Sequence, residues 1–573
     1  MPAHPGLARA LALAASAAVA LTTSVATRSA SAAPPDPVPV NSGRPAPAGP
    51  PSAAPWPGRP AAPWTRPPGR PWVTPSATPS ATPSAASASR TPSPAPTPSV
   101  TPSSPAPPAA LQLTPEQREL VRKVDVGRVN EHLRALHRIA TAHGGNRAAG
   151  TPGYDASRDY VANRLRRAGY RVTLQPFTFT YFEERSAPVL EQISPENTRY
   201  TPVTQDGSDA GDFATMMYSG SGDVTAPVHP VDVTVPPAPD TPSTSGCEAA
   251  DFTGFPRGAI ALIQRGTCEF AVKAANAQAA GAAAVIIFND GGPDRTGVLR
   301  GNLKSPGITI PVVGTSYEVG KDLATAERPV VHVATKTLAE TRTTHNVIAE
   351  SRHGDPDKVV MVGAHLDSVP EGPGMNDNAS GAAAVLAVAE ALSGVKTANR
   401  LRFAWWGAEE PGLIGSTYYV RSLTPEERRR IRLYLNFDML ASPNGAIKIY
   451  DGRRSDGGPP PPGSAQIERL FQAHFAAKAQ PYGRTDLSDH SDHAPFRVAG
   501  IPVGGIFTGA SDKKTAEEVK LFGGTAGRPY DSCYHRACDD LSNIDQRTLR
   551  ITTEAVATTV VVYAFAADPP GFD

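Results

Sequence analysis

The chain has 573 residues, and its 55 lysine and arginine residues almost balance its 54 aspartate and glutamate residues, which leaves a formal net charge of +1. This balance argues against a basic surface for nucleic acid and against electrostatic attraction to an anionic membrane. Any function must therefore come from a local site.

The N-terminal residues have the pattern of a secretory signal. A basic start is followed by an apolar stretch over residues 11–26 and by Ala30-Ser31-Ala32, which is a small-residue cleavage pattern. A buried N-terminal helix fits less well, because a proline-rich run follows at once. We therefore expect a signal peptide over residues 1–32 and a secreted, extracellular protein.

Residues 33–110 consist almost wholly of proline, alanine, serine and threonine. Such a composition buries too little apolar surface to offset the ordering of the backbone, so we predict a disordered linker. The last apolar run of the chain, residues 555–567, is too short to span a bilayer and is predicted to be a core helix.

The folded part is expected to begin at Leu111. Residues 113–145 repeat apolar side chains at helical spacing after Thr114, a plausible cap, and residues 153–170 predict a second helix. The following segment, residues 171–184, alternates β-branched or aromatic residues with polar ones and predicts a strand.

Residues 189–340 differ from the flanking sequence. Short strand-like runs alternate with proline, glycine and aspartate clusters, and residues 269–290 form one helical patch. This pattern predicts a separate, inserted β-rich module without a catalytic cluster. Both a lid or recognition role and a plain scaffold role fit it.

From residue 341 to 568 the pattern becomes strand, loop and helix in repetition. Apolar strands that alternate with helices predict an α/β fold, with a mostly parallel mixed sheet sandwiched by helices. In such sheets, ligands bind beyond the carboxyl ends of the strands. Residues 111–188 and 341–568 are therefore expected to form one catalytic domain around the insert.

Most of the acids and histidines that could form a functional site directly follow predicted strands. Taken alone, each of them could also be a helix cap, a solvated residue at a helix start or part of a surface pair. Glu371 lies in a turn and is expected to be solvated. Together they supply imidazole and carboxylate groups without thiolates, which suits zinc, with cobalt or manganese as substitutes. The candidates are His365, Asp367, Asp377, Glu409, Glu410, Asp438 and His535.

Four cysteines fall as two close pairs, Cys247 with Cys268 and Cys533 with Cys538. In an exported chain this predicts two disulfides. The second bridge would close a small loop around His535.

Several motifs, in their usual order, resemble those of the secreted co-catalytic di-zinc aminopeptidases, relatives of bacterial leucyl aminopeptidase. They are "HLDSVPEGPGMNDNASG", "WWGAEEPGLIGS", "YLNFDM", "SDHAPF", "GGIFTGA" and "CYHRACD". The stretch "FTGFPRGAIALIQRGTCEFAVKAANAQAAGAAAVIIFNDGG" resembles the protease-associated domain that is inserted in many exported peptidases. The resemblance implies a zinc exopeptidase fold and hydrolysis of N-terminal residues from peptides.

The resemblance also implies roles for the metal ligands. One zinc ion would be held by His365 and Asp438 and the other by Glu410 and His535, with Asp377 as the bridge. Similar enzymes have a cis peptide bond directly after the bridging acid. Calcium remains open as a further, modulating cation.

The remaining roles follow from the same resemblance. Glu409 would be the general base that accepts a proton from the water activated by the two zinc ions, and Tyr534 would stabilise the oxyanion. Asp367 would orient His365 by receiving its other ring proton.

The resemblance implies substrate-binding residues as well. Met439 and Phe507 correspond to an apolar pocket, which predicts a preference for large apolar N-terminal residues such as leucine. His490 stands where relatives often carry an arginine that would hold the substrate carbonyl, whereas Asp492 and His493 are expected only to support their loop. We expect a monomer.

Two other functions fit parts of the pattern. A carboxypeptidase or dipeptidase could use the same metal site, and a non-catalytic binding protein could use the insert and the linker for adhesion. The second alternative fits less well, because a relic usually loses metal ligands and all five are present here.

Overall fold

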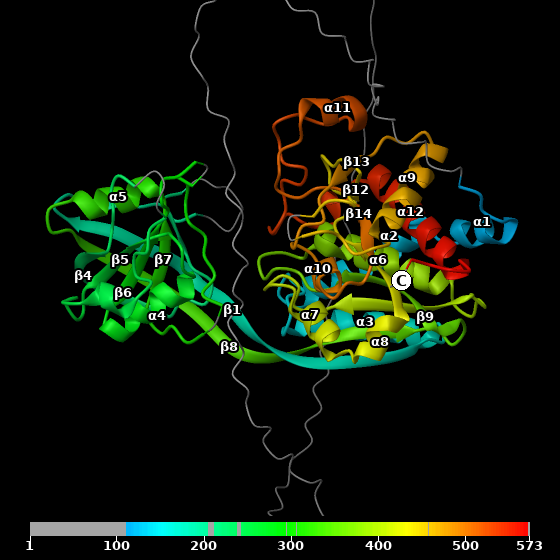
Figure 1. The fold of residues 1–573 in the computed structure, drawn as a ribbon, viewed down its shortest axis with the longest axis horizontal. Helices are drawn as coiled ribbons and strands as arrows, with labels where there is room; N and C mark the ends of the chain where they lie inside the picture. Colours follow the sequence, from blue (N-terminus) through cyan, green and yellow to red (C-terminus); the bar gives the residue numbers. More distant parts are fainter. Residues whose placement is uncertain are drawn as a thin grey trace, which may run out of the picture. The chain divides into compact units, whose positions relative to one another are not determined.

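The computed structural model describes residues 111–203, 211–237, 242–293, 295–304, 306–455 and 458–570 (Figure 1). These residues belong to a compact unit that extends over Val100–Asp573. The expected signal peptide and the whole of the expected linker lie outside the described residues.

Three helices open the described chain: α1 (Pro115–Arg122), α2 (Val126–Ala142) and α3 (Pro152–Arg167). Thr114 caps α1 as predicted, because its side chain accepts a hydrogen bond from the backbone N–H of Gln117. The single helical run predicted over residues 113–145 is wrong. The side chain of Asp125 accepts from the N–H of Arg128 and starts a second helix there.

The central sheet is mixed and mostly parallel, as predicted. Its strands are β8 (Val330–Glu350), β9 (Asp355–His365), β10 (Asn399–Trp406), β11 (Ile431–Phe437), β12 (Lys448–Tyr450), β13 (Gly483–Thr485) and β14 (Val503–Phe507). They lie in the order β13-β12-β14-β11-β9-β10-β8. β10, β9, β11 and β14 are parallel to one another, so their carboxyl ends meet at one edge.

Helices cover both faces of this sheet. Successive residues of a strand point to opposite faces, so each strand contributes side chains to both layers. Val360 and Val362 of β9 pack with α2, α6, α9 and α12, whereas Met361 packs with α7 and α10. The bounds of the helices in this part are α6 (Gly381–Ala391), α7 (Ile414–Ser422), α8 (Pro425–Arg430), α9 (Ser464–Ala477), α10 (His493–Val498), α11 (Ala516–Phe522) and α12 (Gln546–Phe565).

The closing helix α12 contains most of the apolar run 555–567, and its residues Val556, Val560 and Val561 are fully buried. The prediction of a core helix is therefore confirmed. No helix among the described residues is long and apolar enough to cross a membrane.

The inserted module joins the central sheet through a long antiparallel pair. β1 (Arg171–Ser194) pairs with β8 from Arg171 opposite Glu350 to Ser194 opposite Val330 (Figure 1). The boundaries predicted at residues 189 and 340 therefore fall inside continuous strands. The other elements of the module are β2 (Thr198–Arg199), β3 (Phe213–Thr215), β4 (Gly222–Val231), β5 (Ile260–Gln264), β6 (Ala284–Phe288), β7 (Val312–Thr315), α4 (Phe270–Ala280) and α5 (Tyr317–Thr325).

The helical patch predicted over residues 269–290 is only half helix. α4 ends at Gly281, whose φ of 87° lies in the left-handed region that favours glycine. The β-branched residues that follow, Val285 to Ile287, lie in the buried strand β6. Both predicted disulfides, Cys247–Cys268 and Cys533–Cys538, are present.

Candidate metal centre

The ends of three parallel strands bring the first group of candidate residues together. His365 is the last residue of β9, Asp438 follows β11 directly, and Glu409 lies in the loop after β10. Since these strands are neighbours in the sheet, their ends meet at one edge. The structure therefore brings these candidate residues together at the edge of the sheet where the site was expected.

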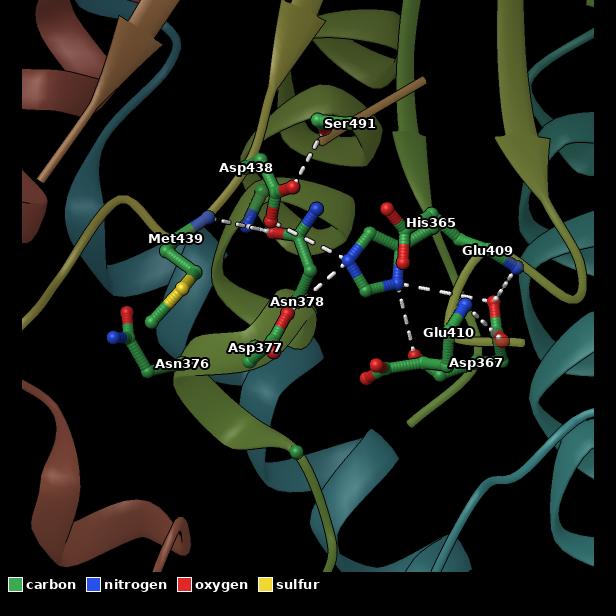
Figure 2. Close-up of polar contacts among 12 residues, drawn as sticks. His365, Asp367, Asn376, Asp377, Asn378, Glu409, Glu410, Asp438, Met439 and Ser491 are labelled. Carbon is green, nitrogen blue, oxygen red and sulfur yellow. Dashed lines mark hydrogen bonds and ion pairs between the residues drawn. The ribbon is translucent and has the colours of Figure 1, made fainter. Parts of the chain in front are cut away.

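Asp377 reaches this edge from the turn η2 (Met375–Ser380), which leads into α6. The bond Asp377–Asn378 is a non-proline cis peptide, as the resemblance implied. The side chain of Asn378 holds the turn, because it donates to the carbonyl of Phe437 at 2.9 Å and accepts from the N–H of Met439 at 3.2 Å (Figure 2).

The carboxylate of Asp377 contacts both histidines, one with each oxygen. Its Oδ1 lies 3.1 Å from Nε2 of His365, and its Oδ2 lies 3.2 Å from Nε2 of His535. Nε2 of His365 is also 3.3 Å from Oδ1 of Asp438, and Nε2 of His535 is 3.0 Å from Oε2 of Glu410. Two groups of potential ligands thus share one carboxylate, and the contacts of the first converge on the ring of His365 (Figure 2).

The residues present fit zinc. Oε1 of Glu410 and Oδ1 of Asp438 are buried and accept no hydrogen bond, which is costly unless a cation lies against them. Single ligand atoms of His365, Asp377 and Glu410 lie within 4.8 Å of one another, and so do those of His365, Glu409 and Asp438. Imidazole and carboxylate donors without thiolates suit zinc, and the four cysteines are all in disulfides.

Asp367 is fully buried, and it contacts His365 with a different atom from the one expected. Nδ1 of His365 is 3.1 Å from the backbone carbonyl of Asp367 but 3.8 Å from its carboxylate. The carboxylate instead accepts from the backbone N–H groups of Glu409 and Glu410 at 3.2 and 3.3 Å (Figure 2). Burial raises the pKa of Asp367 to about 7. Asp367 therefore fixes the His365 ring and the main chain of both glutamates.

The pKa of Glu409 is raised well above its usual value, first by burial and then by the acids around it, of which Asp492 is the strongest. Burial and the negative charges of nearby acids, Asp377 first and Glu410 next, raise the pKa of Tyr534. The ring of Tyr534 stacks on that of His535 with 3.8 Å between the centroids, inside the loop closed by Cys533 and Cys538. The phenol thus keeps its proton beside the metal ligands.

The expected substrate residues are only partly brought together. Met439 is buried, and its carbonyl accepts from the N–H of Thr508 at 3.0 Å, so it lies beside Phe507. His490 is exposed and forms no hydrogen bond or ion pair with another described residue. His493 supports its loop as expected, because its Nε2 lies 2.6 Å from the carbonyl of Ser488.

Several residues that hold the site were not predicted from the sequence. Oδ1 and Oδ2 of Asp539 accept from the backbone N–H groups of Asn376 and Asp377 at 2.8 and 3.0 Å. The hydroxyl of Ser491 donates to Oδ2 of Asp438 at 2.7 Å (Figure 2). The position of Asp539 directly after the Cys538 of a predicted disulfide was the available signal.

Arg147 is a further missed residue. Its fully buried guanidinium donates to the backbone carbonyls of Leu366, Pro373 and Gly374. It therefore ties the two ends of the loop between His365 and the turn η2. Nothing in the periodicity around Arg147 marks it as buried.

The chain is similar to known proteins both in the insert and in the sheet that carries the site. A family model described as Peptidase family M28 matches residues 346–560, and a PA domain model matches residues 224–323. An aminopeptidase of Pseudomonas aeruginosa is 48% identical over 443 residues, which are 76% of this chain and 81% of that protein. A probable leucine aminopeptidase 2 of Aspergillus fumigatus is 38% identical, with 74% of this chain and 81% of that protein covered. Among solved structures, BSAP, a zinc aminopeptidase from Bacillus subtilis, is similar with a TM-score of 0.51 and 26% identity, over 76% of this chain and 94% of that chain.

Proposed function

Since the chain belongs to peptidase family M28, carries an inserted PA domain and is a zinc-dependent aminopeptidase, we propose that it removes large apolar residues, leucine above all, from the N-termini of peptides. The observation that carries this proposal is the carboxylate of Asp377, which contacts His365 with one oxygen and His535 with the other. A carboxylate that faces one imidazole with each oxygen is suited to hold two adjacent zinc ions.

Two zinc ions are part of the proposal. His365 and Asp438 would hold one ion, Glu410 and His535 the other, and Asp377 both. When bound, the ions supply Lewis-acid chemistry, in which the substrate carbonyl is polarised and a water molecule is made more acidic.

Glu409 is the general base in this scheme. Its carboxylate accepts a proton from the attacking water and later passes that proton to the amine that leaves. The N–H of Glu409 is fixed by the carboxylate of Asp367, so the base cannot move independently of the neighbouring ligand Glu410. Burial around Glu409 keeps bulk water away from the proton that it carries.

Tyr534 stabilises the negative oxygen that forms on the substrate. A tyrosine phenol is protonated at neutral pH, and burial raises the pKa of Tyr534 further, so its hydroxyl can donate a hydrogen bond. The loop between Cys533 and Cys538 restricts the movement of this side chain.

The first side chain of the substrate binds beside Met439 and Phe507. The backbone N–H of Thr508 donates a hydrogen bond to the carbonyl of Met439, which joins the two segments that carry these residues. Leucine fits an apolar wall of this kind, and the name of the Aspergillus fumigatus relative supports the same preference.

The proposal includes export, a monomeric state and an extracellular site of action. Residues 1–32 carry the secretory pattern, and the two disulfides are typical of proteins in an oxidising compartment. N-terminal sequencing of the protein from culture medium tests the cleavage, and a start at the initiator methionine would contradict it.

Three anilides and peptides test the activity. Leucine p-nitroanilide should be hydrolysed, and its N-acetylated form should not, because an aminopeptidase requires the free amine. A leucine dipeptide amide, which has a blocked C-terminus, should also be hydrolysed. Hydrolysis of an N-acetylated leucine dipeptide with a free C-terminus, without hydrolysis of the dipeptide amide, would instead identify a carboxypeptidase.

A further inference from the structure

A cavity of about 510 Å³ lies beside the metal centre. Glu410 and His535 line it on the side of the metal ligands. The loop after β9, the strand β1 and segments of the inserted module form the other walls. The cavity is therefore continuous with the place where the scissile bond must lie.

The cavity is distinct from the wall that receives the first side chain of the substrate. Neither Met439 nor Phe507 lines it. A peptide whose first side chain lies against Met439 and whose scissile bond lies at the metal centre has to continue in another direction. The cavity offers the space for the residues that follow, an assignment that rests on the proposed function.

Two carboxylates in the cavity lack a basic partner. Glu184 of β1 and Glu371 of the loop after β9 both line it, and neither forms an ion pair with a lysine or arginine among the described residues. Burial raises the pKa of both groups, and the negative charge of Glu184 contributes to the shift of Glu371. Glu371, which was expected to be solvated, is partly exposed and lines this cavity.

Apolar walls lie next to these acids. The rings of Phe182 on β1 and Tyr218 in the insert pack edge to face with 5.6 Å between their centroids, and both line the cavity. A lysine or arginine side chain matches such a lining, since its aliphatic stem packs on aromatic rings while its charged end binds carboxylates. A glutamate in the same place would face Glu184 and Glu371. The other charged side chains that line the cavity are mostly acidic as well: Glu183, Asp367 and Glu410, beside the basic Arg300.

We propose that this cavity is the subsite for the second residue of the substrate and that it favours lysine or arginine there. The inserted module then has a role in recognition, because Tyr218 forms part of the wall. The preferred substrate is then a peptide with leucine as its first residue and lysine or arginine as its second.

The test compares kcat/KM for the tripeptides Leu-Lys-Ala, Leu-Ala-Ala and Leu-Glu-Ala on the full-length zinc-loaded enzyme. One charge-assisted hydrogen bond corresponds to about a tenfold preference for lysine over alanine. Glutamate should be the poorest of the three. Glu371→Gln and Glu184→Gln should each reduce the lysine preference, and the double variant should abolish it.

Glu196→Gln is the matched control, because Glu196 is exposed and does not line the cavity. It should keep the full preference for lysine. Equal kcat/KM for Leu-Lys-Ala and Leu-Ala-Ala, or a preference that persists in the double variant, would overturn the subsite. If none of the tripeptides is hydrolysed, the proposed aminopeptidase function fails and the subsite fails with it.

Discussion

Replacement of Asp539 by asparagine tests how the bridging carboxylate is held. Asp539 is buried, and its two oxygens accept from the backbone N–H groups of Asn376 and Asp377. It also accepts from the side chain of Asn543 at 2.9 Å. Asparagine has almost the same shape but only one acceptor, so one backbone N–H must face an amide that cannot accept a hydrogen bond.

The size of the effect follows from these contacts. A hydrogen bond to a charged group contributes about 1.5–3 kcal/mol, and a donor left buried without an acceptor adds to the loss. The free energy of unfolding of Asp539→Asn should therefore fall by about 3 kcal/mol. Because the affected N–H belongs to Asp377 or its neighbour, zinc affinity should fall about tenfold or more.

Urea unfolding of the apo-protein measures the first quantity, and zinc competition against a chromogenic chelator measures the second. Asp540→Asn is the control, because the side chain of Asp540 accepts from Ser542 at the start of η3 (Leu541–Asn543) and not from the backbone of η2, and asparagine caps a helix about as well as aspartate. It should leave zinc affinity unchanged. An unchanged zinc affinity in Asp539→Asn would refute the role of this side chain in positioning Asp377.

Three further predictions concern the base, the disulfide loop and acid stability. Glu409→Gln should keep its zinc and its melting temperature but lose at least about 100-fold in kcat, and an active variant would remove the base assignment. Joint replacement of Cys533 and Cys538 by serine should cost about 2 kcal/mol in unfolding free energy and weaken zinc binding through His535, as seen by urea unfolding and chelator competition. Burial lowers the pKa of His474 to about 4. Between about pH 6.5 and pH 4 the unfolded chain therefore binds a proton at this histidine and the folded chain does not. This group alone should make the protein about 2 kcal/mol less stable at pH 5 than at pH 8, and His474→Phe should lose that part of the pH dependence.

The position of the metal centre could be predicted because its signals are local. Apolar runs that predict strands end directly before His365, Asp438 and the pair Glu409-Glu410. The rule that parallel strands present their carboxyl ends at one edge then joins residues that lie far apart in the chain. The position of Asp377 was indicated by the glycine-rich turn before an alanine-rich helix.

Other features depend on contacts that the sequence does not express. The pairing of β1 with β8 joins strands more than a hundred residues apart, so composition alone suggested boundaries in the middle of both. Asp539 accepts hydrogen bonds from backbone N–H groups of a turn that is distant in the sequence. Every residue except proline has such a group, so the sequence does not indicate which ones Asp539 binds. Glu371 and Glu184 line the same cavity although they lie far apart in the sequence, so their proximity could not be predicted. Asp125 carried a helix-cap signal that the continuing apolar periodicity masked.

Titration of the apo-protein with zinc tests the central claim most directly, since that claim is a two-ion centre shared by Asp377. Metal content and leucine p-nitroanilide hydrolysis would be followed together, in the wild-type chain and in Asp377→Asn. We expect two zinc ions per wild-type chain, with full activity only when both are bound, and severely weakened binding in the variant. Full activity with a single zinc ion, or two tightly held ions in Asp377→Asn, would contradict it.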